Sequence, residues 1–123
     1  MKNKIKFALL GFGRIALKHF SILSSNKIKN VELVAICEKN KKKLNKVKIP
    51  KKIKIYSDLK KMIKNEQIDV ISILSESGNH FKNIKEISKF KKNMVVEKPI
   101  CMNSNQLSKV IEISKKKKLK FLL

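Results

Sequence analysis

The sequence predicts an α/β fold, a doubly wound parallel sheet of about six strands with helices on both faces. Short apolar runs, typical of buried parallel strands, recur along the whole chain. The segments between them carry apolar residues at helical spacing. This alternation of strand and helix is the pattern of a parallel sheet, and 123 residues suit one domain with a single core.

Each element can be located from its apolar pattern. Strands are expected over residues 5–10, 31–37, 53–56, 68–74, 94–96 and 119–123. Helices are expected over residues 14–24, 39–47, 59–63, 81–90 and 104–117. Ser57 and Asp58 offer an N-cap for the third helix. The whole chain, residues 1–123, is therefore interpreted as one domain.

A glycine-containing turn, Gly11-Phe12-Gly13-Arg14-Ile15-Ala16, joins the first strand to the first helix. Gly11 would allow a tight turn, Gly13 would let the backbone approach a pyrophosphate, and Ala16 would let the helix pack on the strand. The N–H groups and dipole of a helix start attract a diphosphate. We expect a dinucleotide cofactor to bind at Gly11, Phe12, Gly13, Arg14 and Ile15, the turn of a Rossmann fold.

Glu38 ends the second strand, where it can accept hydrogen bonds from the ribose hydroxyls of adenosine. A carboxylate there repels a 2′-phosphate, so NAD is expected rather than NADP. The neighbouring lysines, beginning with Lys39, weaken this discrimination. An acidic side chain that is merely solvated is the alternative.

Polar residues also follow the fourth and fifth apolar runs. Ser75, Ser77 and His80 are expected to border the nicotinamide half of the cofactor, because ligands of such sheets bind beyond the carboxyl ends of the strands. A capping or packing role is the alternative for His80. Lys98 stands where the fifth run ends, and burial beside a charged group can make a lysine a general acid or base for oxidising a sugar hydroxyl.

The chain is strongly basic, with 31 basic and 9 acidic residues and a net charge of +22. A nucleic-acid-associated protein is one interpretation of this charge. Against it, every basic residue except Arg14 is lysine, the lysines are spread along the chain, and no aromatic stacking platform is evident. The abundance of Lys, Ile and Asn favours codon bias in an AT-rich genome.

The remaining features exclude some other classes of protein. No apolar run is long enough to span a bilayer, and the N-terminus does not have the pattern of a signal peptide. Cys37 and Cys101 have neither metal-ligand spacing nor a disulfide framework. No metal site is expected, and a reducing cytoplasm is the expected location.

Several of these motifs together resemble the N-terminal domain of the Gfo/Idh/MocA oxidoreductases. They are the glycine turn followed by His19, Ala35-Ile36-Cys37-Glu38, Ser77-Gly78-Asn79-His80 and Val95-Val96-Glu97-Lys98-Pro99. The resemblance implies a Rossmann domain that binds NAD, with Glu97 at the cofactor and Lys98 near the nicotinamide ring and the substrate hydroxyl. Gly-Arg-Ile-x-x-x-His-Phe and Ser-Gly-x-His resemble the members that oxidise UDP-N-acetyl-glucosaminuronic acid at its 3-position.

Two departures from that family qualify the functional expectation. Ser75-Glu76 stands where the family usually has Thr-Pro, which could perturb nicotinamide binding. The family continues into a larger α/β domain that supplies a catalytic histidine and most substrate contacts. We therefore expect the NAD-binding part of a sugar or sugar-nucleotide dehydrogenase, in a truncated or split form. The alternative is a non-catalytic NAD-binding module that works with a partner chain carrying that domain.

Overall fold

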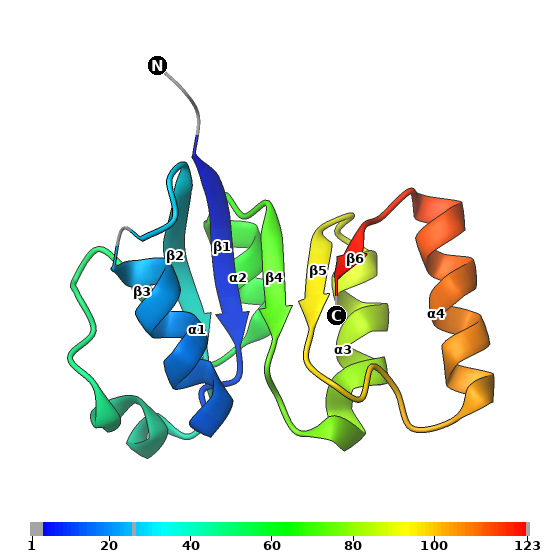
Figure 1. Cartoon of the computed structure of the whole chain (residues 1–123), viewed down its shortest axis with the longest axis horizontal. Coiled ribbons are helices and arrows are strands. Elements are labelled where there is room, and N and C mark those ends of the chain that lie inside the picture. The colour runs from blue at the N-terminus through cyan, green and yellow to red at the C-terminus, as the bar shows by residue number, and fades with distance from the viewer. Residues whose placement is uncertain (1–3, 26, 123) are drawn as a thin grey trace.

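Six parallel strands form one sheet in the order β3-β2-β1-β4-β5-β6. The structure, a computed structural model, describes residues 4–25 and 27–122 (Figure 1). The strands are β1 (Ile5–Leu10), β2 (Val31–Cys37), β3 (Lys54–Tyr56), β4 (Val70–Ile73), β5 (Asn93–Val96) and β6 (Phe121–Leu122). The predicted doubly wound parallel sheet is confirmed. The strand order reverses between β1 and β4, and that switch point is where such sheets bind ligands.

Helices cover the two faces of the sheet unequally. The helices are α1 (Arg14–Ser24), α2 (Leu59–Asn65), α3 (His80–Ser88) and α4 (Ser104–Lys117), with 3-10 turns η1 (Lys41–Lys46) and η2 (Ser77–Asn79). Residues of α1 and η1 pack on one face, around Leu9 and Ile36. Residues of α2, α3 and α4 pack on the other, around Ile71 and Met94.

The face that carries α1 is open over the last strand. Phe121 packs against the core of the opposite face, so its neighbour Leu122 points to the α1 side, because side chains alternate along a strand. Leu122 is 66% exposed. Within residues 4–25 and 27–122, α1 and η1 are the helices on this face, and the apolar surface of β6 lies beyond their reach.

Local capping explains several helix boundaries. The Asp58 carboxylate accepts the Lys60 N–H at 3.1 Å at the start of α2, as expected from the sequence. Asn103 accepts the Gln106 N–H at 2.9 Å at the start of α4. Lys118 ends that helix in the left-handed conformation, with φ of 53°.

One predicted helix differs in type, and the other differences from the predicted elements lie at their ends. The expected helix over 39–47 is the shorter 3-10 turn η1, in which only Leu44 packs against the core. Phe90 lies beyond the end of α3. The last strand is limited to Phe121–Leu122, and the predicted strand residue Leu123 lies outside the described residues.

Candidate functional site

An open groove of about 770 Å³ lies beyond the carboxyl ends of β1, β2 and β4. All strands point to this edge because the sheet is parallel (Figure 1). Of the residues predicted to bind the cofactor, the groove is lined by Gly11, Phe12, Gly13, Arg14, Ile15, Glu38 and Ser75. The loops after three strands therefore contribute to one cavity, although they are far apart in the sequence.

The first glycine of the turn is held where only glycine fits. Gly11 has φ of +96°, and a Cβ atom there would lie 2.8 Å from the Ser75 nitrogen. Its N–H donates to the Cys37 carbonyl at 2.8 Å, which extends the pairing of β1 with β2. The tight turn expected at Gly11 therefore also brings the loop after β1 against the loop after β4.

The second glycine opens onto free space. A Cβ atom at Gly13 would meet no atom within 4 Å. Gly13 is the N-cap of α1, whose first turn has no side-chain cap and no acidic residue. Uncapped N–H groups at a helix start that faces a groove suit an anionic group.

Phe12 differs from the simple expectation of a cofactor contact. Its ring is fully buried and packs edge-on against Phe20, with ring centroids 5.8 Å apart. Only the backbone of this residue can therefore face a ligand. Its N–H is already used, because it donates to Glu38 Oε1 at 2.8 Å.

Glu38 is held by backbone donors on both sides. Oε1 accepts the Phe12 N–H, and Oε2 accepts the Asn40 N–H at 2.9 Å. Each carboxylate oxygen retains a second lone pair for a further donor, such as a ribose hydroxyl. Below it, burial raises the pKa of the Cys37 thiol to about 11, and the nearby Asp58 and Glu38 carboxylates add to that shift. This thiol is therefore protonated at neutral pH and is a weak nucleophile.

The groove is also lined by residues that were not predicted from the sequence to belong to the site. They include Lys39, Lys43, Ser57, Asp58, Leu59, Glu76, Asn79, Lys82, Asn83 and Glu86. Ser75 Oγ donates to Asn83 Oδ1 at 2.6 Å, which fixes the loop after β4 on α3. Lys82 and Glu86 stand four positions apart on a predicted helix, a spacing that places them on one face and could have drawn attention to them.

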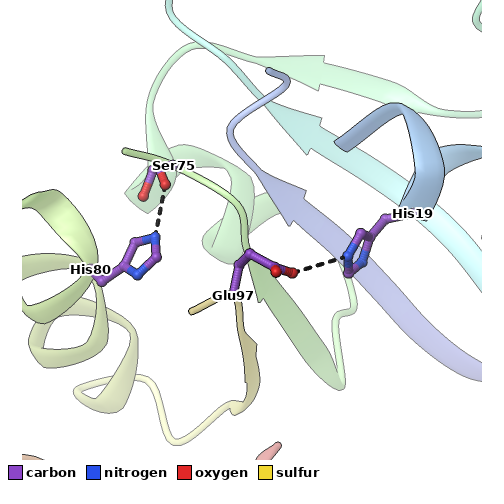
Figure 2. Close-up of polar contacts among 4 residues, drawn as sticks. All are labelled: His19, Ser75, His80 and Glu97. Atoms are coloured by element: carbon purple, nitrogen blue, oxygen red, sulfur yellow. Dashed lines mark hydrogen bonds and ion pairs between the residues drawn. The ribbon is translucent and has the colours of Figure 1, made fainter. Parts of the chain in front are cut away.

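The predicted residues Ser77, His80, Glu97 and Lys98 lie on the same edge of the sheet but outside the lining of this groove. Glu97 continues the sheet, since its N–H donates to the Ile73 carbonyl at 3.2 Å. Its carboxylate lies 3.6 Å from His19 Nε2 (Figure 2). His19 therefore connects α1 to the segment after β5.

His80 is placed differently from the expected cofactor contact. Its ring is only 1% exposed. Nε2 lies 2.7 Å from the Ser75 carbonyl oxygen and Nδ1 lies 2.6 Å from that of Pro99 (the first contact is drawn in Figure 2). The ring therefore contacts two backbone carbonyls, an arrangement that agrees with the packing role given as the alternative.

Lys98 also differs from its expected environment. The general acid or base role was derived from burial, but the Lys98 side chain is exposed. Burial of this amine would require a further group, such as a ligand, to cover it.

The groove fits a dinucleotide on the chemistry of its own atoms. The space at Gly13 and the uncapped start of α1 suit a diphosphate, and the anchored Glu38 carboxylate suits two ribose hydroxyls. Within residues 4–25 and 27–122, no group of three His, Cys, Asp or Glu residues could hold a metal ion. None of the described helices is both long enough and apolar enough to span a membrane.

The charged groups of the groove are mixed in sign. Arg14, Lys39, Lys43 and Lys82 line it together with the carboxylates of Glu38, Asp58, Glu76 and Glu86. Lysine is otherwise found in each of the helices described and in the loops at both edges of the sheet. The structure thus shows no segregation of lysine onto one helix or one edge.

Comparison with known proteins agrees with this geometry. A myo-inositol 2-dehydrogenase of Thermotoga maritima is 26% identical over 113 residues, which are 91% of this chain and 33% of that protein. The WlbA dehydrogenase of Chromobacterium violaceum, solved with NADH and UDP-GlcNAcA, superimposes with a TM-score of 0.87 at 25% identity. The match covers 98% of this chain and 34% of that one. The scyllo-inositol dehydrogenase of Lactobacillus casei, solved with NAD(H) and scyllo-inositol, gives a TM-score of 0.87 at 25% identity over 98% of this chain and 36% of that one.

These relatives are longer, and the chain spans about a third of the length of each. The model of the Gfo/Idh/MocA oxidoreductase family, described as an NAD-binding Rossmann fold, matches residues 5–123. The glycine turn, the anchored Glu38 and the reversal of strand order all fall within that match. The chain therefore belongs to the Gfo/Idh/MocA oxidoreductase family, as its NAD-binding Rossmann domain.

Proposed function

We propose that this chain holds NAD in the groove and forms the cofactor half of a dehydrogenase that oxidises a hydroxyl of a sugar or sugar nucleotide. The observation that carries the proposal is the open position at Gly13 beside the uncapped start of α1, in the same groove as Glu38. The relatives solved with NADH and UDP-GlcNAcA, or with NAD(H) and scyllo-inositol, support this class of substrate.

Each part of the groove has a proposed task. The backbone at Gly13, Arg14 and Ile15 would hold the diphosphate, since helix N–H groups and the dipole favour a negative charge. Glu38 would orient the adenosine ribose and disfavour a 2′-phosphate, so NAD is preferred over NADP. Ser75 and the neighbouring Ser77 would border the nicotinamide half.

The proposed chemistry assigns one proton transfer to this chain. When bound, NAD would be the acceptor of the hydride that leaves the alcohol carbon. A base must remove the hydroxyl proton at the same time, and we assign that role to the neutral Lys98 amine, which takes the proton on Nζ and becomes an ammonium. Glu97, held by Ile73 and His19, would fix the segment that carries Lys98.

Residues beyond these 123 are proposed to complete the active site, in a longer chain or in a partner chain. Two features support this: the Lys98 side chain is exposed, and Leu122 is 66% exposed on the open face of the sheet. Without those residues we expect the chain to bind NAD but to turn over sugars slowly or not at all. Since both cysteines are free, we propose a reducing cytoplasm as the location.

Titration calorimetry with NAD tests the proposal. We expect a dissociation constant on the order of micromolar, equivalent to about 8 kcal/mol. Gly13→Leu should weaken binding by tenfold or more without loss of thermal stability, because the new side chain would enter the space left at Gly13. Ser108→Leu, which introduces the same side chain on the exposed surface of α4, is the control. No heat of binding from the folded wild-type chain would overturn the proposal.

A further inference from the structure

The ring of His80 joins two loops that are remote in sequence. It is 1% exposed, and its two nitrogens lie 2.7 Å from the Ser75 oxygen and 2.6 Å from the Pro99 oxygen. Both partners are carbonyls, which only accept hydrogen bonds. A ring nitrogen that carries hydrogen donates to the carbonyl it faces. The rigid ring thus fixes the separation of the Ser75 and Pro99 carbonyls.

Each loop that His80 holds is also fixed from another side. Ser75 lies against Gly11 and donates through its hydroxyl to Asn83 at 2.6 Å. On the other loop, Glu97 is tied by its N–H to the Ile73 carbonyl at 3.2 Å. Lys98 therefore lies between a residue anchored on β4 and a residue anchored on His80, although its own side chain is exposed.

We propose that His80 is a positioning residue that sets the place of Lys98 relative to the Ser75 loop, and so organises the nicotinamide end of the site. This rests on the function proposed above. The ring would not touch the cofactor, because it is buried beneath the rim. Its action would pass through Pro99 on one side and Ser75 on the other.

Comparing NAD with ADP-ribose tests this role, since ADP-ribose lacks only the nicotinamide. His80→Leu removes both ring nitrogens and should weaken NAD binding by about tenfold or more while leaving ADP-ribose within about twofold. His80→Gln keeps one amide donor and should recover part of the loss. Ser88→Ala is the matched control, because Ser88 is a buried polar residue of the same helix and its hydroxyl, the group removed, donates to the Lys85 carbonyl of that helix. It should change neither constant.

A second substitution shows whether His80 acts through the Lys98 segment. In a Lys98→Ala background the effect of His80→Leu on NAD affinity should shrink, since coupled residues are not additive. Equal loss of NAD and ADP-ribose, or full additivity with Lys98→Ala, would overturn the positioning role. A ratio of the NAD and ADP-ribose dissociation constants that is the same in His80→Leu as in the wild type would also overturn it.

The wild-type chain offers a measurement that does not depend on a variant folding. The ring ¹H–¹⁵N resonances of His80 should move on addition of NAD and stay in place on addition of ADP-ribose. Equal shifts with both ligands would overturn the proposal. If the folded wild type bound neither ligand, the proposed function would fail as well; binding of both, with an unchanged ratio in the variants, would remove only the role of His80.

Discussion

The Glu38 carboxylate accepts the Phe12 N–H at 2.8 Å, and this bond joins the end of β2 to the glycine turn after β1. The same carboxylate accepts the Asn40 N–H at 2.9 Å. A charged side chain held by two backbone donors keeps a fixed direction before any ligand arrives. Glu38 therefore combines two tasks, ordering the turn and presenting a negative charge to the groove.

We predict that Glu38→Ala raises the ratio of NADP to NAD affinity by about tenfold or more, because removing the carboxylate removes repulsion of a 2′-phosphate beside Lys39 and Lys43. NAD affinity itself should fall, since the Phe12 N–H loses its acceptor. Calorimetric titration with both cofactors measures the ratio. Glu112→Ala makes the same change in net charge on the exposed surface of α4 and should leave the ratio unchanged. An unchanged ratio in Glu38→Ala would remove Glu38 from the site.

We predict that Gly11→Ala destabilises the fold by about 2 kcal/mol or more, because alanine must adopt a positive φ and its Cβ would overlap the Ser75 backbone. For a domain of this size that is a fall of about 8 °C or more in the melting temperature. Gly78→Ala is the control, since a Cβ atom there meets nothing within 4 Å. Equal melting temperatures for the two variants would contradict the close approach of the two loops.

Much of the fold was predictable because its signals are local. The bounds of β1, β2, α1 and α4 follow from apolar runs and helical repeats, and the structure reproduces them. The shared edge was also predictable, because parallel strands end on the same side of the sheet. That is why Gly13, Glu38 and Ser75 could be assigned to one groove without coordinates.

The contacts of single side chains were not predictable in the same way. The two carbonyls that meet His80 lie 5 and 19 positions away in the sequence, and their approach depends on the course of two loops. The spacing of Lys82 and Glu86 places them on one face of a helix, but whether that face borders the groove depends on how α3 docks on the sheet. The exposure of the Lys98 side chain likewise depends on which groups pack over this edge of the sheet, and a sequence motif does not predict that.

Cys37 provides a test of the groove wall that needs no cofactor. Its pKa is raised from an ordinary value of 9.0 to about 11, chiefly by burial and then by the Asp58 and Glu38 carboxylates. Since one pKa unit is a tenfold change, the thiolate fraction near pH 8 should be about 100-fold lower in the folded chain than in the unfolded one. Alkylation by iodoacetamide, followed by mass spectrometry, should therefore modify Cys101, which is only half-buried, well before Cys37.

The same shift makes stability depend on alkaline pH, in a direction that can be worked out. Between pH 9 and 11 the unfolded chain loses the Cys37 proton while the folded chain keeps it. The folded state then binds more protons, so the free energy of unfolding falls as pH rises through this window, and the contribution is intact below pH 9. Cys37→Ala should flatten this fall relative to the wild type, while the many lysines titrate alike in both proteins and cancel in the difference. The free energy of unfolding of both proteins would be measured against pH by urea unfolding. The same pH dependence in the wild type and in Cys37→Ala would show that the pKa of the Cys37 thiol is not raised by burial and the nearby carboxylates.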